Sequence, residues 1–204
     1  MSKTIDFYFD YSSPFGYLAS ERIEAIAQKH DRAIVWHPLL LGAIFKVTKQ
    51  APLTQAPLKG DYSIHDFSRS AREHKLTYKH PDPFPIATVW ACRATLWLRD
   101  NADASIRAHT TPFVHAVFRA FYTQGQDISD QTVLSTIASS LGIDQNQMGA
   151  ALGEQSIKDA LRREVDDAVN TGIFGSPMMI VDNEPFWGHD RLEQLDRWLD
   201  TGGW

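Results

Sequence analysis

The hydrophobic positions at the start of the chain change their period at one point. Over residues 4–10, aromatic and β-branched side chains alternate with polar ones, which predicts a strand. From Pro14 onward the hydrophobic positions recur every three or four residues, which predicts a helix directly after that strand. A second apolar run over residues 33–41 contains Pro38, so we expect an edge strand or one that ends near the proline. This order predicts the start of a βαβ unit.

The middle of the chain has a helical pattern and almost no strand signal. Residues 46–60 are rich in Pro, Gln and Lys and are predicted to form a long loop. The helix-length segments after this loop span residues 61–76, 85–100, 112–125, 130–142 and 156–172. The pattern therefore predicts an all-helical block that interrupts the α/β order.

The α/β pattern returns after residue 172. Residues 177–182 form a short apolar run that predicts a buried strand, and residues 183–185 read as a turn. Residues 185–188 are a candidate second strand of a hairpin, and residues 190–200 place their hydrophobic side chains on one face of a helix. The last strands and helix are thus expected to join the same α/β unit that the first 41 residues begin.

Composition narrows the class of protein. Of 204 residues, 43% are hydrophobic and 22% are charged, as in ordinary globular domains. The net charge of -5, with basic residues scattered among acidic ones, argues against a nucleic-acid partner. No stretch has the roughly 18 apolar residues that a membrane span needs. The first residues also lack the apolar core of a signal peptide, so we expect a cytoplasmic protein without a membrane partner.

Residues suited to redox or metal chemistry are sparse. Cys92 is the single cysteine, which excludes an intramolecular disulfide and a dithiol motif, and we expect it to be a small apolar residue on a helix face. The eight histidines are dispersed and form no H-x-x-x-H or H-E-x-x-H pair. No metal site is therefore predicted.

The junction between the first strand and the first helix carries Ser13 and Pro14. Pro14 suits the first helical position, which makes Ser13 the natural N-cap. That structural role is sufficient by itself to explain the serine. A helix N-terminus also stabilises an anion, and a hydroxyl donated to a thiolate would lower the thiol pKa further. The chain supplies no suitable thiol of its own, whereas glutathione would.

Several motifs resemble one known family. The segment Ser13-Pro14-Phe15-Gly16 has the position and length of the C-x-x-C motif of thioredoxin-like disulfide oxidoreductases, and Pro177 resembles their cis proline before a strand. A helical insertion is typical of the DsbA-like branch. The segments "FDYSSPFGYLA" and "FGSPMMIVDNEPFWGHDRL" are similar to those of 2-hydroxychromene-2-carboxylate isomerases and of the related kappa-class glutathione transferases.

This resemblance implies an α/β fold in which a thioredoxin-like domain is interrupted by an all-helical insertion. Residues 1–45 and 168–204 are expected to form the thioredoxin-like domain, and residues 46–167 the insertion. It also implies glutathione as cofactor and a homodimer as the assembly.

The resemblance assigns roles to individual residues. Ser13 matches the serine that activates the glutathione thiol. Ser176, just before Pro177, matches the residue whose backbone pairs with the cysteinyl part of glutathione as an added strand would.

The γ-glutamyl end of glutathione is expected at residues 187–190, which are Trp187, Gly188, His189 and Asp190. The alternative for Asp190 is a helix N-cap that forms a capping box with Glu193, and both roles can hold at once.

An acidic aromatic substrate is expected near Phe45, Lys46, Gln50 and Thr88. Lys46 suits pairing with its carboxylate, and a solvated surface lysine is the alternative. Several relatives carry Gly-Asn where this chain has Lys49-Gln50, so the resemblance does not define the exact substrate.

The implied activity is isomerisation of 2-hydroxychromene-2-carboxylate to trans-o-hydroxybenzylidenepyruvate by reversible addition of the glutathione thiolate. A kappa-type glutathione transferase and a non-catalytic glutathione-binding domain are the alternatives. A disulfide oxidoreductase is excluded because Ser13 and Gly16 stand where that chemistry needs two cysteines.

Overall fold

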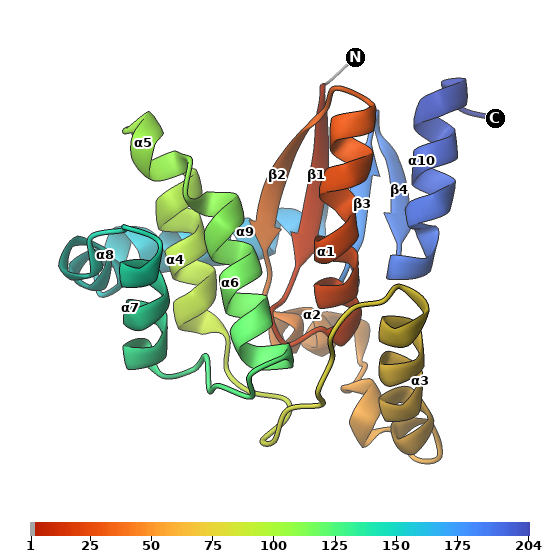
Figure 1. The fold of residues 1–204 in the computed structure, drawn as a ribbon, viewed down its shortest axis with the longest axis horizontal. Helices are drawn as coiled ribbons and strands as arrows, with labels where there is room; N and C mark the ends of the chain where they lie inside the picture. Colours follow the sequence, from red (N-terminus) through yellow and green to blue (C-terminus); the bar gives the residue numbers. More distant parts are fainter. Residues whose placement is uncertain (1–2) are drawn as a thin grey trace.

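The computed structural model describes residues 3–204 as a four-stranded sheet with helices on both faces (Figure 1). The strands lie in the order β2-β1-β3-β4, with β2 parallel to β1 and with β3 and β4 each antiparallel to its neighbour. The strands are β1 (Thr4–Phe9), β2 (Ala33–Pro38), β3 (Met178–Val181) and β4 (Glu184–Trp187).

The helices follow the predicted order, with additions. The longer ones are α1 (Pro14–Lys29), α3 (Lys59–Glu73), α4 (Val89–Arg99), α6 (Thr110–Tyr122), α7 (Gln131–Ser140), α9 (Gln155–Asn170) and α10 (Leu192–Thr201). The shorter ones are α2 (Leu41–Thr48), η1 (Leu53–Gln55), α5 (Ala104–Arg107), α8 (Gln145–Leu152) and η2 (His189–Arg191). All five predicted helical segments of the middle block are confirmed.

The two faces of β1 explain how the layers assemble. Ile5, Phe7 and Phe9 are fully buried and belong to the core that includes α1, α4 and α6. Tyr8 points the other way and packs with residues of α2 and α9, which lies behind the sheet in Figure 1. The alternation that predicted the strand thus buries one face fully and half-buries the other.

Strand β2 ends at Pro38 and lies at the edge of the sheet, as its proline predicted. The final hairpin is also confirmed. Its turn is formed by Asp182 and Asn183, whose φ angles are 51° and 69°, so it begins before the predicted residues 183–185.

The prediction of one long loop over residues 46–60 was wrong in part. Helix α2 extends to Thr48, η1 lies inside the segment, and α3 begins at Lys59. Nothing in the structure tests the proposed division into residues 1–45 with 168–204 and residues 46–167, which stays a prediction. Residues 1 and 2, which that division includes, lie outside the described residues.

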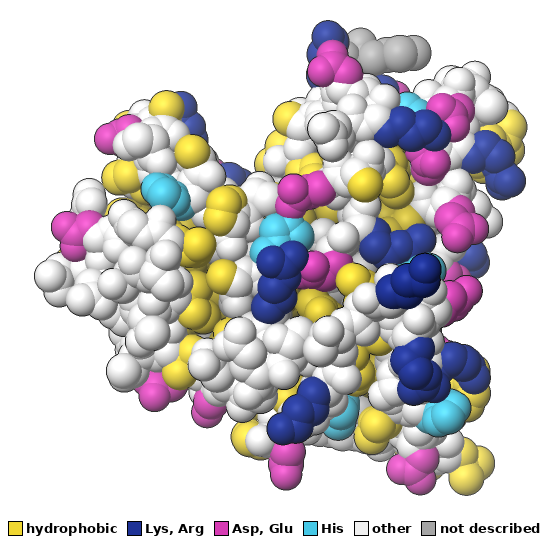
Figure 2. All heavy atoms as spheres, in the orientation of Figure 1, with side chains coloured by type: hydrophobic (Ala, Val, Ile, Leu, Met, Phe, Trp, Pro, Cys, Tyr) yellow, Lys and Arg dark blue, Asp and Glu magenta, His cyan; other side chains and the backbone are white. Residues whose placement is uncertain are grey.

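Cys92 is fully buried in the core, as predicted, and burial raises the pKa of its thiol well above the ordinary value. Basic and acidic side chains are interspersed on the face shown in Figure 2. Within residues 3–204, no helix is long and apolar enough to span a bilayer.

Candidate active site

Ser13 lies between the end of β1 and the start of α1, and it caps that helix. Its Oγ accepts from the Gly16 amide at 3.0 Å, and Pro14 occupies the first turn, so the predicted N-cap is confirmed. The side chain is 5% exposed. The hydroxyl therefore lies just below the surface, at the positive end of a 16-residue helix.

Ser176 meets Ser13 from the other half of the chain. The Ser13 hydroxyl donates to the Ser176 carbonyl at 2.9 Å, and the peptide bond from Ser176 to Pro177 is cis. Ser176 is half-buried and Pro177 is buried. The structure thus brings together two residues that lie 163 positions apart in the sequence and that both belong to the predicted site.

Gly16 lies close to the side chains of both serines. A Cβ placed on Gly16 would lie 3.1 Å from the Ser13 Cβ and 3.1 Å from the Ser176 Oγ. Any larger residue would push the two serines, so a glycine here keeps their spacing. Gly16 replaces the second cysteine of a C-x-x-C motif, and its lack of a side chain has this steric reason.

The predicted γ-glutamyl segment starts beside this pair. The Gly188 amide donates to the Pro177 carbonyl at 3.0 Å, and Gly188 has a φ of 107°, which favours glycine. Trp187 is 55% exposed and its ring meets that of Phe174 edge-on at 4.9 Å. Trp187 therefore offers an open aromatic surface next to the cis proline.

His189 stacks on Phe15 of α1, with ring centroids 4.6 Å apart and planes 11° apart. Its Nδ1 is buried and has no hydrogen-bond partner among the described residues. Burial lowers the pKa of His189, so the ring is neutral near pH 7 and its free nitrogen is able to accept or donate one hydrogen bond. The stacking fixes this segment against the helix that Ser13 caps.

The capping box expected at Asp190 was wrong. Asp190 lies inside η2, and the residue at the N-cap of α10 is Arg191, which makes no side-chain cap bond. The Asp190 carboxylate is exposed and lies 3.2 Å from the Arg191 guanidinium. Its exposure leaves room for an ammonium group from outside, and this other predicted role stays a prediction.

The predicted substrate residues are spread over two elements. Phe45 and Lys46 lie on α2, where Phe45 is half-buried and Lys46 is exposed, and Gln50 is exposed just after that helix. Thr88 is 3% exposed, and its hydroxyl donates to the Asp10 carboxylate at 2.8 Å. The hydroxyl of Thr88 is thus engaged inside the protein, and the substrate contacts stay predictions.

Asp10 belongs to the segment "FDYSSPFGYLA" that carries the family resemblance, but the sequence analysis gave it no role. It follows β1, is 3% exposed, and its amide donates to the Ser176 Oγ at 3.0 Å. The sequence shows an acidic residue three positions before Ser13. Its burial and its long-range partners come from the fold, so no local pattern could have identified them.

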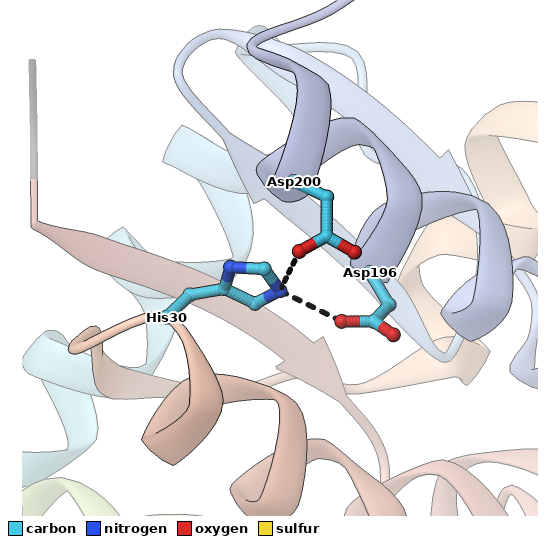
Figure 3. Close-up of side chains that lie close together, drawn as sticks. All are labelled: His30, Asp196 and Asp200. Atoms are coloured by element: carbon cyan, nitrogen blue, oxygen red, sulfur yellow. Dashed lines mark hydrogen bonds and ion pairs between the residues drawn. The ribbon is translucent and has the colours of Figure 1, made fainter.

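One group of side chains in residues 3–204 has the composition of a metal site. His30, Asp196 and Asp200 lie together where α1 ends beside α10 (Figure 3). The Lys29 ammonium already contacts both carboxylates, at 2.9 Å and 2.8 Å. The cluster is accounted for as a surface ion-pair network, in which Lys29 supplies the positive charge.

Two surface hollows lie away from Ser13. One, of about 280 Å³, lies between β4 and α10 and is lined in part by Trp187, Trp198 and Trp204. The other, of about 380 Å³, lies between α7 and α8. Of the predicted site residues, only Trp187 lines either of them.

Comparisons with known proteins agree with this fold. The family model of the DSBA-like thioredoxin domain matches residues 4–200. A 2-hydroxychromene-2-carboxylate isomerase from Sphingobium xenophagum is 31% identical and covers 98% of this chain and 99% of its own length. A kappa-class glutathione transferase (kappa 2) from Caenorhabditis elegans is 23% identical and covers 97% of this chain and 92% of its own. The solved structure of a 2-hydroxychromene-2-carboxylate isomerase superposes with a TM-score of 0.85 at 24% identity and covers 97% of this chain and 95% of its own.

Proposed function

This chain belongs to the DsbA-like thioredoxin family and, within it, to the 2-hydroxychromene-2-carboxylate isomerase family, and from this premise we propose that it is a glutathione-dependent isomerase. It would interconvert 2-hydroxychromene-2-carboxylate and trans-o-hydroxybenzylidenepyruvate in the degradation of naphthalene-type aromatics. The observation that carries the proposal is the position of Ser13, a hydroxyl beside Ser176 at the N-terminus of α1.

The Ser13 hydroxyl and the helix terminus together suit a thiolate. A free thiol with a pKa near 8.5 is only a few per cent ionised at neutral pH. Lowering that pKa by about 2 units stabilises the thiolate by roughly 2.7 kcal/mol. The hydroxyl donates to the Ser176 carbonyl in this structure. In the proposed complex, the cysteinyl amide of glutathione bonds that carbonyl as an added strand would, and the Ser13 hydroxyl turns to the sulfur.

The proposed reaction balances without a further reactant. After the hemiketal ring opens, the thiolate adds to the benzylic carbon of the double bond, and the electron pair moves to the ketone oxygen as an enolate. The former double bond is now single and rotates. The enolate then returns its electron pair, the C–S bond breaks, and the trans isomer leaves with the thiolate regenerated. Glutathione is needed but is not consumed, which is nucleophilic catalysis by an external thiol.

A kappa-type glutathione transferase is the second candidate, because a relative of that name aligns over 97% of this chain. A glutathione-binding domain without catalysis is the third. A cytoplasmic location, where glutathione is plentiful, and a homodimeric assembly belong to the same proposal.

A spectrophotometric assay of chromene isomerisation tests the proposal. We expect turnover with glutathione, and none with S-methylglutathione, which keeps the tripeptide but has no free thiol. Isomerisation that is independent of glutathione would contradict the mechanism. A stable conjugate from chlorodinitrobenzene at high turnover, with no isomerisation, would favour the transferase. Binding of glutathione without either reaction would favour the non-catalytic domain.

A further inference from the structure

Asp10 is a buried carboxylate that collects hydrogen bonds from three separate segments. Its Oδ1 accepts from the Ser12 amide at 2.8 Å and from the Thr88 hydroxyl at 2.8 Å. Its Oδ2 accepts from the Leu41 amide at 2.7 Å. The donors are 2, 31 and 78 residues away in the sequence, so the carboxylate links parts of the chain that are far apart in the sequence.

Two of these donors are the starting points of helices. Leu41 is the first residue of α2, whose N-cap Leu40 makes no side-chain cap bond, so Asp10 supplies the missing acceptor. Thr88 is the N-cap of α4. Asp10 therefore holds the beginnings of both helices that carry the predicted substrate residues.

The main chain of Asp10 is hydrogen-bonded to both serines of the site. Its carbonyl accepts from the Ser13 amide at 2.9 Å, and its amide donates to the Ser176 Oγ at 3.0 Å. One residue thus contacts both serines through its backbone and both substrate-bearing helices through its side chain.

The charge of Asp10 has no cationic partner. None of the ion pairs within residues 3–204 includes it, although it is 3% exposed. Burial raises the pKa of Asp10, and the hydrogen bonds from Ser12, Leu41 and Thr88 offset only part of that rise. Burying a carboxylate without a counter-charge is unfavourable, so packing alone does not explain why this position is acidic.

We propose that Asp10 is a positioning residue for the reaction, because it fixes the starts of α2 and α4 relative to Ser13 and Ser176. This assignment rests on the proposed function. The bonds of Ser13 to the Gly16 amide and the Ser176 carbonyl do not involve the Asp10 carboxylate, so we expect them to persist when the carboxylate is changed. Loss of the carboxylate should therefore loosen the starts of α2 and α4, near which the substrate is expected, and leave Ser13 and Ser176 in place.

The test is Asp10→Asn, with Asp6→Asn as the matched control. Both changes replace a carboxylate near β1, but the Asp6 carboxylate contacts His37 and none of the site residues. The asparagine puts an NH₂ group against at least one of the present donors. We expect the KM for 2-hydroxychromene-2-carboxylate to rise about tenfold in Asp10→Asn, since hydrogen bonds to charged groups contribute strongly. The pKa of the bound glutathione thiol should stay at the wild-type value, and Asp6→Asn should leave the KM unchanged.

A merely structural role would lower the amount of folded protein and leave the KM of the remainder unaltered. If Asp10→Asn does not fold, Asp10→Glu replaces it, because it keeps the negative charge but moves the carboxylate away from the three donors by one methylene group. We then expect a several-fold rise in KM with the pKa of the bound glutathione thiol at the wild-type value. A wild-type KM in the Asp10 variant that folds would overturn the assignment while the isomerase proposal stands. A wild-type enzyme without glutathione-dependent isomerisation would overturn both.

Discussion

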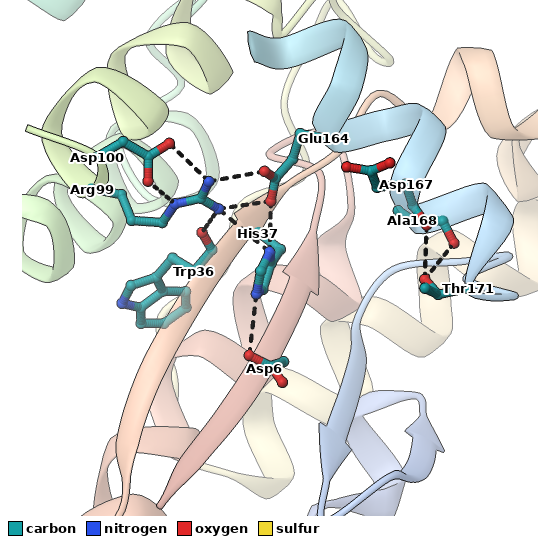
Figure 4. A network of polar contacts seen from close by, with 9 residues as sticks. All are labelled: Asp6, Trp36, His37, Arg99, Asp100, Glu164, Asp167, Ala168 and Thr171. Carbon is teal, nitrogen blue, oxygen red and sulfur yellow. Dashed lines mark hydrogen bonds and ion pairs between the residues drawn. The ribbon is translucent and has the colours of Figure 1, made fainter. Parts of the chain in front are cut away.

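Two clusters of polar side chains join the sheet to the helices, and they are built from different chemistry. In the first, His37 of β2 lies between the carboxylates of Asp6 and Glu164, and Arg99 of α4 pairs with Glu164 (Figure 4). The second is formed by Ser13, Ser176 and Thr88 around Asp10. The first is held by paired charges, whereas the second is held by hydroxyls, backbone groups and one unpaired carboxylate.

The paired charges of the first cluster leave few free donors or acceptors for a ligand. Arg99 binds Glu164 through two nitrogens, at 2.7 Å and 2.8 Å, and it also donates to the Trp36 carbonyl. Every charge there already faces an opposite one, so the cluster ties α4 and α9 to the sheet. A hydroxyl such as that of Ser13 can rotate from one acceptor to another without leaving a buried charge unmatched. This difference is why we place the chemistry at Ser13.

The largest expected effect is a loss of stability when the first cluster is broken. Glu164→Gln removes the carboxylate that both Arg99 and His37 face, and it leaves these two half-buried side chains with a poorer partner. We expect the free energy of unfolding to fall by about 3 kcal/mol. Chemical denaturation measures that change, and the kcat of isomerisation by the folded enzyme should be unchanged.

Asp166→Asn is the control for this variant, because Asp166 is an exposed carboxylate on the same helix. It should change the unfolding free energy by less than about 0.5 kcal/mol. If Glu164→Gln were as stable as this control, the ion-paired cluster would not hold the layers together. If it instead lost kcat, the separation between the clusters would be wrong.

A smaller effect concerns pH. Burial acts to lower the pKa of His37, but its hydrogen bonds to Asp6 and Glu164 outweigh burial and raise it. Burial acts to raise the pKa of Glu164, but Arg99 and His37 lower it to about 2. The stability from His37 is therefore fully present below its unfolded pKa, near 6.5, and is lost as the pH rises through its folded pKa. The stability from Glu164 is present above about 4.5 and is lost as the pH falls toward 2.

Unfolding of wild type and His37→Gln over a pH series measures this contribution. The stability difference should be greatest between about pH 4.5 and 6.5 and should shrink above that window. A difference that grows with rising pH would show that His37 is held in the neutral form, and the first cluster would then lose its description as paired charges.

Local sequence rules explain the Ser13 side of the site well. The change of hydrophobic period, Pro14 at the first turn and Ser13 before it are all short-range signals, and each leads to the observed helix start. The two hallmark motifs also placed Ser176 and Pro177 in the same site. That placement came from the resemblance to a known family, and the contact of Ser176 with Ser13 is a tertiary contact that only the structure shows.

The features missed from the sequence depend on distant partners. Helix α2 begins after Leu40, a residue with no capping side chain, because its acceptor is Asp10, about thirty residues earlier in the chain. The capping box at Asp190 looked correct from spacing alone, but the chain forms η2 there and starts α10 at Leu192. In both places a tertiary or short-helix arrangement replaced the local rule, so periodicity and spacing were insufficient.

The pKa of the glutathione thiol when bound to the enzyme tests the central claim most directly. The ultraviolet absorbance of the thiolate, followed over a pH series, measures it for wild type and for Ser13→Ala. We predict a value about 2 units below that of a free thiol in wild type, and a return toward 8.5 in Ser13→Ala with glutathione still bound. Equal pKa values in the two proteins would contradict the account, because Ser13 would then be a helix cap and nothing more.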